Sequence, residues 1–357
     1  MLLQRSSPLC SHLIRFGQFT RLEHTMEHPL VMRILASSVN LASRASTIVR
    51  NILASKDLEI VDKGVNDLQS KADRDAQRFI VGSLSQSFPG LKIIGEEGKL
   101  DDSELAISPE LTKEVIDQQC PSAYLSTNLS DVVVWVDPLD GTKEFTEGIV
   151  EHVTILIGIS VHGKPVAGVI AQPFYHDASI PQSPTADPPR VSPSKTVTRT
   201  VWALDGLGVF GLTPRLPAGQ LPYPLDSARK PGDAPHIIVV TRSHPTPALS
   251  AATEACYPTK VIRAGGCGNK ILMLLEGRAH VYVFPSPGTK RWDTCASEAV
   301  LAAAGGRLTD IRGQQYNYAA TPDPVNRGGI LATPVADWLS IYAGLMPKTV
   351  LDSLSFK

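Results

Sequence analysis

The sequence has little cysteine and almost no net charge, and each shortage excludes a class of protein. Its 5 cysteines show no CxxC spacing. An odd number of dispersed cysteines favours reduced thiols in an intracellular compartment over a disulfide framework or a zinc site. With 34 basic and 35 acidic residues the formal charge is -1, so no overall field attracts nucleic acid or an anionic membrane surface. Any anion-binding site must therefore be built locally.

Long apolar runs are missing as well. No stretch of about 18 apolar residues occurs, which argues against a transmembrane anchor. We therefore expect neither a membrane nor a nucleic acid as a partner. A chain of 357 residues more naturally forms two lobes than one core, and two lobes predict a cleft between them.

The first 28 residues are predicted to be an N-terminal extension. They contain Arg5, Arg15 and Arg21, and no acidic residue precedes Glu23. This composition is typical of a mitochondrial transit segment, and it is equally compatible with a disordered extension. We expect a cytoplasmic protein, with a mitochondrial location as the alternative that the extension allows.

The rest of the chain is predicted to divide into an N-terminal α+β lobe over residues 29–175 and a C-terminal α/β lobe over residues 176–345. Two stretches of the second lobe, near 176–199 and 214–235, are rich in proline with few apolar anchors. Such composition predicts flexible insertions.

Apolar periodicity predicts the main elements. Residues 30–53 show helical spacing, and a second helix is expected to begin near Asp73 and to end near Phe88. Short apolar runs rich in β-branched residues predict strands at 91–94, 132–136, 154–160, 166–171, 237–240 and 281–284. A third helix is predicted to start near Lys290 and to end at Gly305.

The strand at 132–136 runs directly into Asp137 and Asp140, followed by Gly141 and Thr142. The two carboxylates favour a cation at the strand end. The glycine turn and the free N–H groups of a following helix favour a phosphate. One short segment therefore predicts both halves of a metal-assisted phosphate site.

Five carboxylates lie at predicted strand ends or helix starts, where α/β proteins collect functional residues. They are Asp73, Glu96, Asp137, Asp140 and Asp293. Carboxylates without histidine or cysteine select Mg²⁺ or Mn²⁺ over Zn²⁺, and such ions serve phosphoryl transfer. Taken alone, Asp73 is better explained as a first-turn carboxylate favoured by the helix dipole. A solvated acidic turn explains Glu96 equally well.

A glycine cluster at 265–268 precedes Lys270 and an apolar helical run. Glycines before a helix allow backbone N–H groups to approach an anion closely. The spacing matches neither the P-loop nor the dinucleotide fingerprint, so it supports neither an NTPase nor a Rossmann oxidoreductase. From the residues alone, Lys270 and His244 fit a structural role as well as a binding role.

Three segments together resemble the signatures of a known family. Residues 95–98 (Gly-Glu-Glu-Gly), 137–142 (Asp-Pro-Leu-Asp-Gly-Thr) and 292–293 (Trp-Asp) resemble, in the same order, those of the lithium-sensitive, magnesium-dependent phosphatases related to inositol monophosphatase. Within that family the chain looks most like the 3'(2'),5'-bisphosphate nucleotidases, through residues 137–148, 241–244, 265–270 and 292–297.

The resemblance implies a layered αβαβα sandwich, of α+β or α/β class, with the active site between two lobes. It implies that Glu96, Asp137 and the carbonyl of Leu139 bind an activating Mg²⁺. Asp137, Asp140 and Asp293 would share a second ion, with Mn²⁺ as a substitute and Li⁺ as an inhibitor. Most metal ligands would then lie in the first lobe.

The resemblance also assigns the catalytic and substrate-binding residues. Asp73 would accept a hydrogen bond from Thr142, and the pair would orient and deprotonate the attacking water. The backbone N–H groups of Gly141 and Thr142 would hold the scissile phosphate. The rest of the nucleotide would contact Thr241, His244, Gly266 and Lys270.

The activity implied is hydrolysis of the 3'-phosphate of 3'-phosphoadenosine 5'-phosphate to AMP and phosphate, with 3'-phosphoadenylyl sulfate as a second substrate. The alternatives are an inositol polyphosphate 1-phosphatase and a catalytically silent nucleotide- or metal-binding relative. The complete set of catalytic carboxylates argues against a protein without catalytic activity. The expected partner is a small phosphorylated nucleotide, and the protein is expected to be a monomer or a homodimer.

Overall fold

The computed structural model describes residues 28–64, 67–100, 107–176, 196–212, 236–321 and 323–354. The predicted N-terminal extension, apart from His28, and the stretch 214–235 lie outside these residues, as does most of 176–199. Within the described ranges no helix is both long enough and apolar enough to span a bilayer.

The first sheet has six strands in the order β3-β4-β5-β6-β7-β8. Their bounds are β3 (Lys92–Gly95), β4 (Val132–Asp140), β5 (Thr154–Val161), β6 (Lys164–Tyr175), β7 (Val197–Leu204) and β8 (Gly208–Phe210). β3 and β4 run parallel and the other neighbours are antiparallel. Every residue of β4 and β5 is buried, which explains their near-continuous apolar sequence: helices cover both faces.

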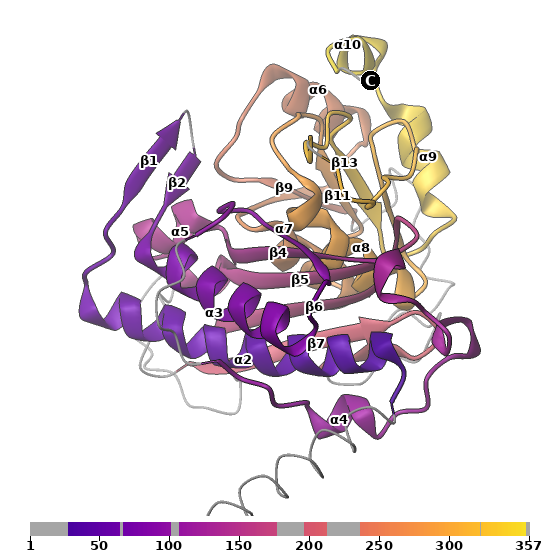
Figure 1. Ribbon diagram of the computed structural model, residues 1–357. Helices are drawn as coiled ribbons and strands as arrows, with labels where there is room; N and C mark the ends of the chain where they lie inside the picture. The colour runs from indigo at the N-terminus through magenta and orange to yellow at the C-terminus, as the bar shows by residue number, and fades with distance from the viewer. Residues whose placement is uncertain are drawn as a thin grey trace, which may run out of the picture.

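Two long helices cover one face of this sheet, α2 (Leu30–Ser55) and α3 (Lys71–Ser87), and α8 (Arg291–Ala303) packs on the other (Figure 1). All three helices were predicted from apolar periodicity, and all three are confirmed. Ser70 caps α3, because its side chain accepts a hydrogen bond from the Ala72 N–H.

The second sheet has five strands in the order β10-β9-β11-β13-β12. Their bounds are β9 (Ile237–Thr241), β10 (Lys260–Ala264), β11 (Val281–Phe284), β12 (Arg307–Thr309) and β13 (Ile330–Thr333). α7 (Cys267–Leu275) and α8 fill the space between the sheets. The outer face packs against α6 (Pro247–Ala255), α9 (Trp338–Leu345) and α10 (Lys348–Asp352). The predicted αβαβα layering is therefore confirmed (Figure 1).

The predicted lobe boundary at 175 does not coincide with an edge of a sheet. β7 follows that boundary in sequence and pairs with β6, with Val169 opposite Trp202. The six-stranded sheet thus takes two strands from residues that the sequence assigned to the second lobe. Where the lobes divide stays a prediction.

The segment before α3, for which the sequence predicted no strand, contains a small hairpin of β1 (Val61–Gly64) and β2 (Asp67–Gln69). All four residues of β1 are exposed. An exposed strand leaves no apolar alternation in the sequence, which is why periodicity missed it. Three short helices complete the elements used below: α4 (Lys113–Ile116), α5 (Thr142–Glu147) and the 3₁₀ helix η3 (Val150–His152).

Two glycines bring α8 directly against the first sheet. Gly158 of β5 and Gly168 of β6 are register partners. A Cβ on Gly158 would lie 2.5 Å from the backbone N of Ala296, and one on Gly168 would lie 2.5 Å from its backbone O. Because α8 carries Asp293 and β4 carries Asp137, this close approach brings the two aspartates together.

We expect Gly158→Ala to lower the free energy of unfolding by about 1–3 kcal/mol, because the added methyl would overlap the backbone N of Ala296 and the buried Cys295 side chain. Denaturant unfolding measures the change. Gly82→Ala in α3 is the matched control, since no atom lies within 4 Å of its Cβ position; a gain of up to about 1 kcal/mol is expected there. Unchanged stability in Gly158→Ala would contradict the packing argument.

Candidate active site

Asp137 and Asp140 lie at the end of β4, and both are buried. The register between β4 and β5 shifts between these two residues. Such a shift re-aims side chains at a strand end. The N–H of Leu139 donates to Asp137 Oδ1 at 3.0 Å, which holds the turned backbone in place.

Asp293 joins the two aspartates from the first turn of α8. One carboxylate oxygen from each of Asp137, Asp140 and Asp293 lies within 4.8 Å of the others. The Lys290 N–H donates to Asp293 Oδ2 at 2.5 Å, so helix capping fixes that carboxylate. The sequence predicted that these three residues would share an ion, and the structure brings them together.

Glu96 follows β3, and its N–H donates to the Val136 carbonyl at 3.0 Å. Burial raises the pKa of Glu96 to about 8, and the Asp293 carboxylate adds to the shift. Burial and the Glu96 carboxylate likewise hold the pKa of Asp137 well above its usual range. Burial, with Asp140 next, raises the pKa of Asp293 to about 6.

Crowded buried carboxylates of this kind resist ionisation unless positive charge lies between them. The donor set is all oxygen, which suits a hard divalent cation. The residues therefore fit the metal that the family resemblance implies. Glu96 stands outside the tight group of three oxygens, next to Asp137.

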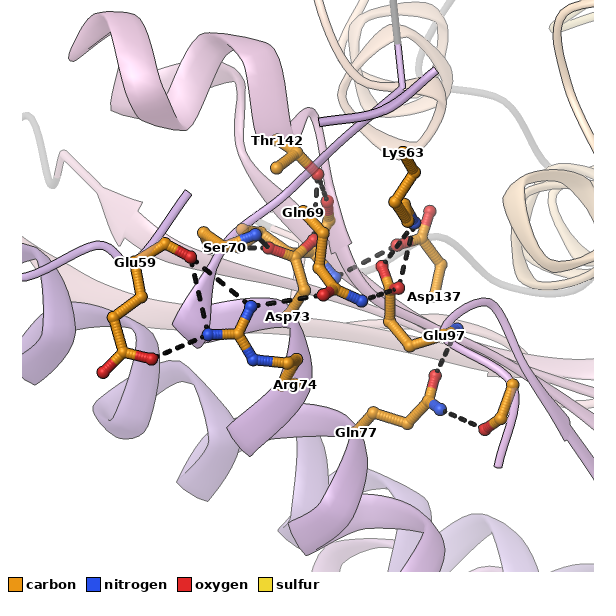
Figure 2. Close-up of polar contacts among 12 residues, drawn as sticks. Glu59, Lys63, Gln69, Ser70, Asp73, Arg74, Gln77, Glu97, Asp137 and Thr142 are labelled. Carbon is orange, nitrogen blue, oxygen red and sulfur yellow. Dashed lines mark hydrogen bonds and ion pairs between the residues drawn. The ribbon is translucent and has the colours of Figure 1, made fainter. Parts of the chain in front are cut away.

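Glu97 plays a different part from its neighbour, and the sequence did not predict it. Its side chain is 1% exposed, and Lys63 Nζ lies 2.9 Å from both carboxylate oxygens. Gln69 also donates to Glu97, and Gln77 Oε1 accepts from its backbone N–H at 2.9 Å. Figure 2 shows Lys63 and Gln69 converging on this carboxylate. Glu97 thus ties the β1–β2 hairpin to the metal-binding side of the site.

Asp73 and Thr142 form the hydrogen bond that the resemblance implied. Thr142 Oγ1 lies 2.9 Å from Asp73 Oδ1 and 3.0 Å from the Leu139 carbonyl. The N–H and hydroxyl of Ser70 donate to Asp73 Oδ2 at 2.7 and 2.6 Å (Figure 2). Burial outweighs these bonds and raises the pKa of Asp73 to about 6.

The glycine segment before α7 lies beside the end of β4. Gly141 has a φ of 93° and Gly266 a φ of 68°, and a Cβ on Gly141 would lie 3.7 Å from the Gly266 N. From the sequence, we predicted that the N–H groups at this helix start bind an anion. The anion is the Asp140 carboxylate, which accepts from Cys267 N at 2.7 Å and from Gly268 N at 2.8 Å. The prediction is corrected accordingly: these two N–H groups bind a carboxylate of the protein itself.

Lys270 and His244 lie at the same end of the second sheet. Lys270 Nζ donates to the Gly266 carbonyl and lies 5.0 Å from the Tyr282 ring centroid. His244 Nδ1 is 3.0 Å from Ser243 Oγ and 3.5 Å from Thr241 Oγ1. Four residues predicted to contact substrate, Thr241, His244, Gly266 and Lys270, thus come from two adjacent segments.

Positive charge surrounds His244. Burial, followed by the charges of Lys270, Lys143 and Lys290, lowers the pKa of His244. The imidazole is therefore neutral at pH 7. Sequence reasoning assigned no binding role to Lys143, which directly follows Thr142, or to Lys290, which Arg291 separates from the Trp-Asp pair.

Comparison with known proteins places the chain in a family. The sequence profile of the Inositol monophosphatase family matches residues 31–348. The chain is 43% identical to 3'(2'),5'-bisphosphate nucleotidase 1 of Homo sapiens, over 91% of this chain and 97% of that protein. It is 36% identical to the protein of that name from Dictyostelium discoideum, over 85% and 93%.

A solved structure shares the fold at lower identity. The extragenic suppressor protein suhB of Bartonella henselae matches with a TM-score of 0.61 at 22% identity, covering 87% of this chain and 97% of that one. The site carboxylates, the layered architecture and the profile match over most of the sequence lead to one conclusion. The chain belongs to the inositol monophosphatase family.

Proposed function

We propose that the protein is a 3'(2'),5'-bisphosphate nucleotidase that hydrolyses the 3'-phosphate of 3'-phosphoadenosine 5'-phosphate to AMP and phosphate. The observation that carries the proposal is the grouping of Asp137, Asp140 and Asp293 within 4.8 Å, beside the Asp73–Thr142 hydrogen bond. The relatives that bear this name extend over nearly the whole chain.

The cation of the proposal is Mg²⁺, with Mn²⁺ as a substitute and Li⁺ as an inhibitor. Glu96, Asp137 and the carbonyl of Leu139 would hold one ion, and Asp137, Asp140 and Asp293 would share a second. When bound, these ions would neutralise charge on the phosphoryl oxygens and make water a stronger nucleophile near neutral pH. Ionising these carboxylates is costly without a cation and becomes favourable when Mg²⁺ is present. Cation binding is therefore coupled to the charge state of the site.

The chain's own contribution to proton transfer comes from Thr142 and Asp73. Thr142 Oγ1 can accept a hydrogen bond from the attacking water while it donates to Asp73 Oδ1. With a pKa of about 6, Asp73 is largely ionised at neutral pH and still basic enough to take a proton. Ser70 donates to the other carboxylate oxygen and fixes which oxygen receives that proton.

The nucleotide is proposed to bind against Thr241, His244, Gly266 and Lys270. The positive charges of Lys270, Lys143 and Lys290 act on His244, which supports the proposal because positive charge there would attract a second phosphate. A neutral imidazole at His244 can donate or accept a hydrogen bond. This combination suits a substrate that has two phosphate groups as well as a polar ribose.

A phosphate-release assay tests the proposal. With Mg²⁺ present, 3'-phosphoadenosine 5'-phosphate is expected to be the preferred substrate over 3'-phosphoadenylyl sulfate and inositol 1,4-bisphosphate, and millimolar Li⁺ is expected to inhibit. Preference for the inositol bisphosphate would replace the proposal with the inositol polyphosphate 1-phosphatase alternative. No release from any of these substrates would favour a silent relative.

We expect Asp137→Asn to abolish turnover while leaving the fold intact. Asp137 is the carboxylate that both proposed ions share, and asparagine has the same shape without the charge. Removing one of several crowded carboxylates also relieves repulsion, so the cation-free melting temperature should rise. Phosphate release and circular dichroism measure the two effects. An active, folded Asp137→Asn enzyme would refute the shared-ion arrangement.

The stabilisation by Mg²⁺ is expected to increase as pH rises from about 6 to about 8. The pKa of Glu96 is raised from 4.5 to about 8, so without a cation the folded state binds more protons than the unfolded chain. The stability that this group contributes is fully present below pH 4.5 and is lost as pH rises through about 8. Mg²⁺ binds the ionised carboxylates and should restore it.

Melting temperatures measured with Mg²⁺ and with a chelator across this pH window give the comparison. Asp137→Asn serves as the control, since its response to Mg²⁺ should be much smaller. An equal Mg²⁺ effect at both ends of the window would show that these carboxylates do not titrate as described.

A further inference from the structure

Arg242 connects two parts of the site that the mechanism treats separately. It follows Thr241 at the end of β9, and its guanidinium contacts α5, the short helix that follows β4. Arg242 Nη1 donates to Glu144 Oε1 at 3.2 Å, and Nη2 donates to Glu147. One side chain therefore joins the segment that contains Thr241 and His244 to the helix that begins at Thr142.

We propose that Arg242 and Glu144 form a clamp that sets the spacing between the scissile-phosphate site and the nucleotide-binding segment, which makes Arg242 a positioning residue for bisphosphate selectivity. This rests on the proposed function, because it concerns how two phosphates are held at once. Arg242 itself touches neither phosphate in this account.

Glu144 is buried, and its burial makes the ion pair with Arg242 the more important of the two. Its side chain is 3% exposed, whereas that of Glu147 is 37% exposed. A buried carboxylate needs a paired charge, and loss of its partner leaves an uncompensated charge in the interior. An exposed ion pair such as Arg242–Glu147 contributes little. Glu144 is therefore the partner that depends on Arg242.

Gly265 shows that the glycine segment is fitted around the same carboxylate. A Cβ on Gly265 would lie 2.2 Å from Glu144 Cδ, so only glycine leaves room for it. The Gly265 N–H donates to His152 Nδ1 at 3.2 Å, which anchors this loop to η3. The Arg242 N–H also donates to the Ala264 carbonyl at 3.1 Å. α5, the end of β9 and the loop before α7 thus meet at one buried carboxylate.

The sequence position of Arg242 also suggests direct binding of the second phosphate, since guanidinium groups bind phosphate well. The contacts argue against this. Nη1 and Nη2 each already donate to a carboxylate, and a phosphate bound there would lie beside the buried negative charge of Glu144. The two accounts differ in what loss of Glu144 does, and this difference can be measured.

The test compares kcat/KM for 3'-phosphoadenosine 5'-phosphate with kcat/KM for adenosine 3'-monophosphate, in wild type and in Arg242→Ala, Arg242→Lys and Glu144→Gln. The monophosphate lacks the group that requires correct spacing. We expect Arg242→Ala to reduce the ratio about 10- to 100-fold, the scale of loss from a displacement of about 1 Å. The lysine variant should recover part of it, because an ammonium can still pair with Glu144.

Glu144→Gln should lower the ratio in the same direction as Arg242→Ala, and the double variant should be no worse than Arg242→Ala alone, as for two groups that act as one unit. Melting temperatures identify any variant that has lost its fold. If Arg242→Ala unfolds because Glu144 is left unpaired, the double variant, which has no unpaired buried charge, is assayed in its place. Arg327→Ala, which breaks the exposed pair with Asp323, is the matched control and should leave the ratio unchanged.

Two results would overturn the clamp. One is a normal ratio in Arg242→Ala. The other is a low ratio in Arg242→Ala with a normal or higher ratio in Glu144→Gln, which would make Arg242 a direct phosphate ligand. Failure of the proposed function looks different, because wild type itself would then release no phosphate from the bisphosphate.

Discussion

The repulsion among buried carboxylates around Asp137 is the constraint on which the rest of the site depends. Glu96 after β3, Asp137 and Asp140 from β4, and Asp293 from α8 lie close together, and burial raises the pKa values of Glu96, Asp137 and Asp293. Such an arrangement lowers stability unless a cation is supplied. Much of the surrounding structure holds these groups in place, including the Asp140 bonds to α7 and the capping of α8 by Asp293.

The two halves of the structure position different groups of the site. The first sheet and α8 bring the carboxylates together, with Gly158 and Gly168 allowing the close approach. The segment after β9 brings His244 and the first turn of α7 brings Lys270, and the charges of Lys270, Lys143 and Lys290 act on His244. Asp140 links the two, since its carboxylate belongs to the cation group and also accepts hydrogen bonds from the start of α7. The carboxylate group and the start of α7 are therefore connected through Asp140.

The sequence predicts the long helices and most strands, and it singles out five carboxylates, of which the structure brings Asp137, Asp140 and Asp293 within 4.8 Å of one another. It could not predict contacts made across long stretches of chain. The pairing of Lys63 with Glu97 depends on an exposed hairpin that has no apolar signature. The glycine segment before α7 has the pattern of an anion site, but spacing cannot reveal that Asp140 is the anion. Arg242 lies in a recognisable motif, yet its partner Glu144 is on another helix.

The most direct test of the account is to locate the cation itself. Crystals grown with Mn²⁺ would give an anomalous scattering signal at each bound ion. The account predicts a peak in direct contact with the Asp137 carboxylate, with Asp140, Asp293 or Glu96 completing the ligands. Full Mn²⁺ occupancy elsewhere on the protein, with no peak beside Asp137, would contradict it.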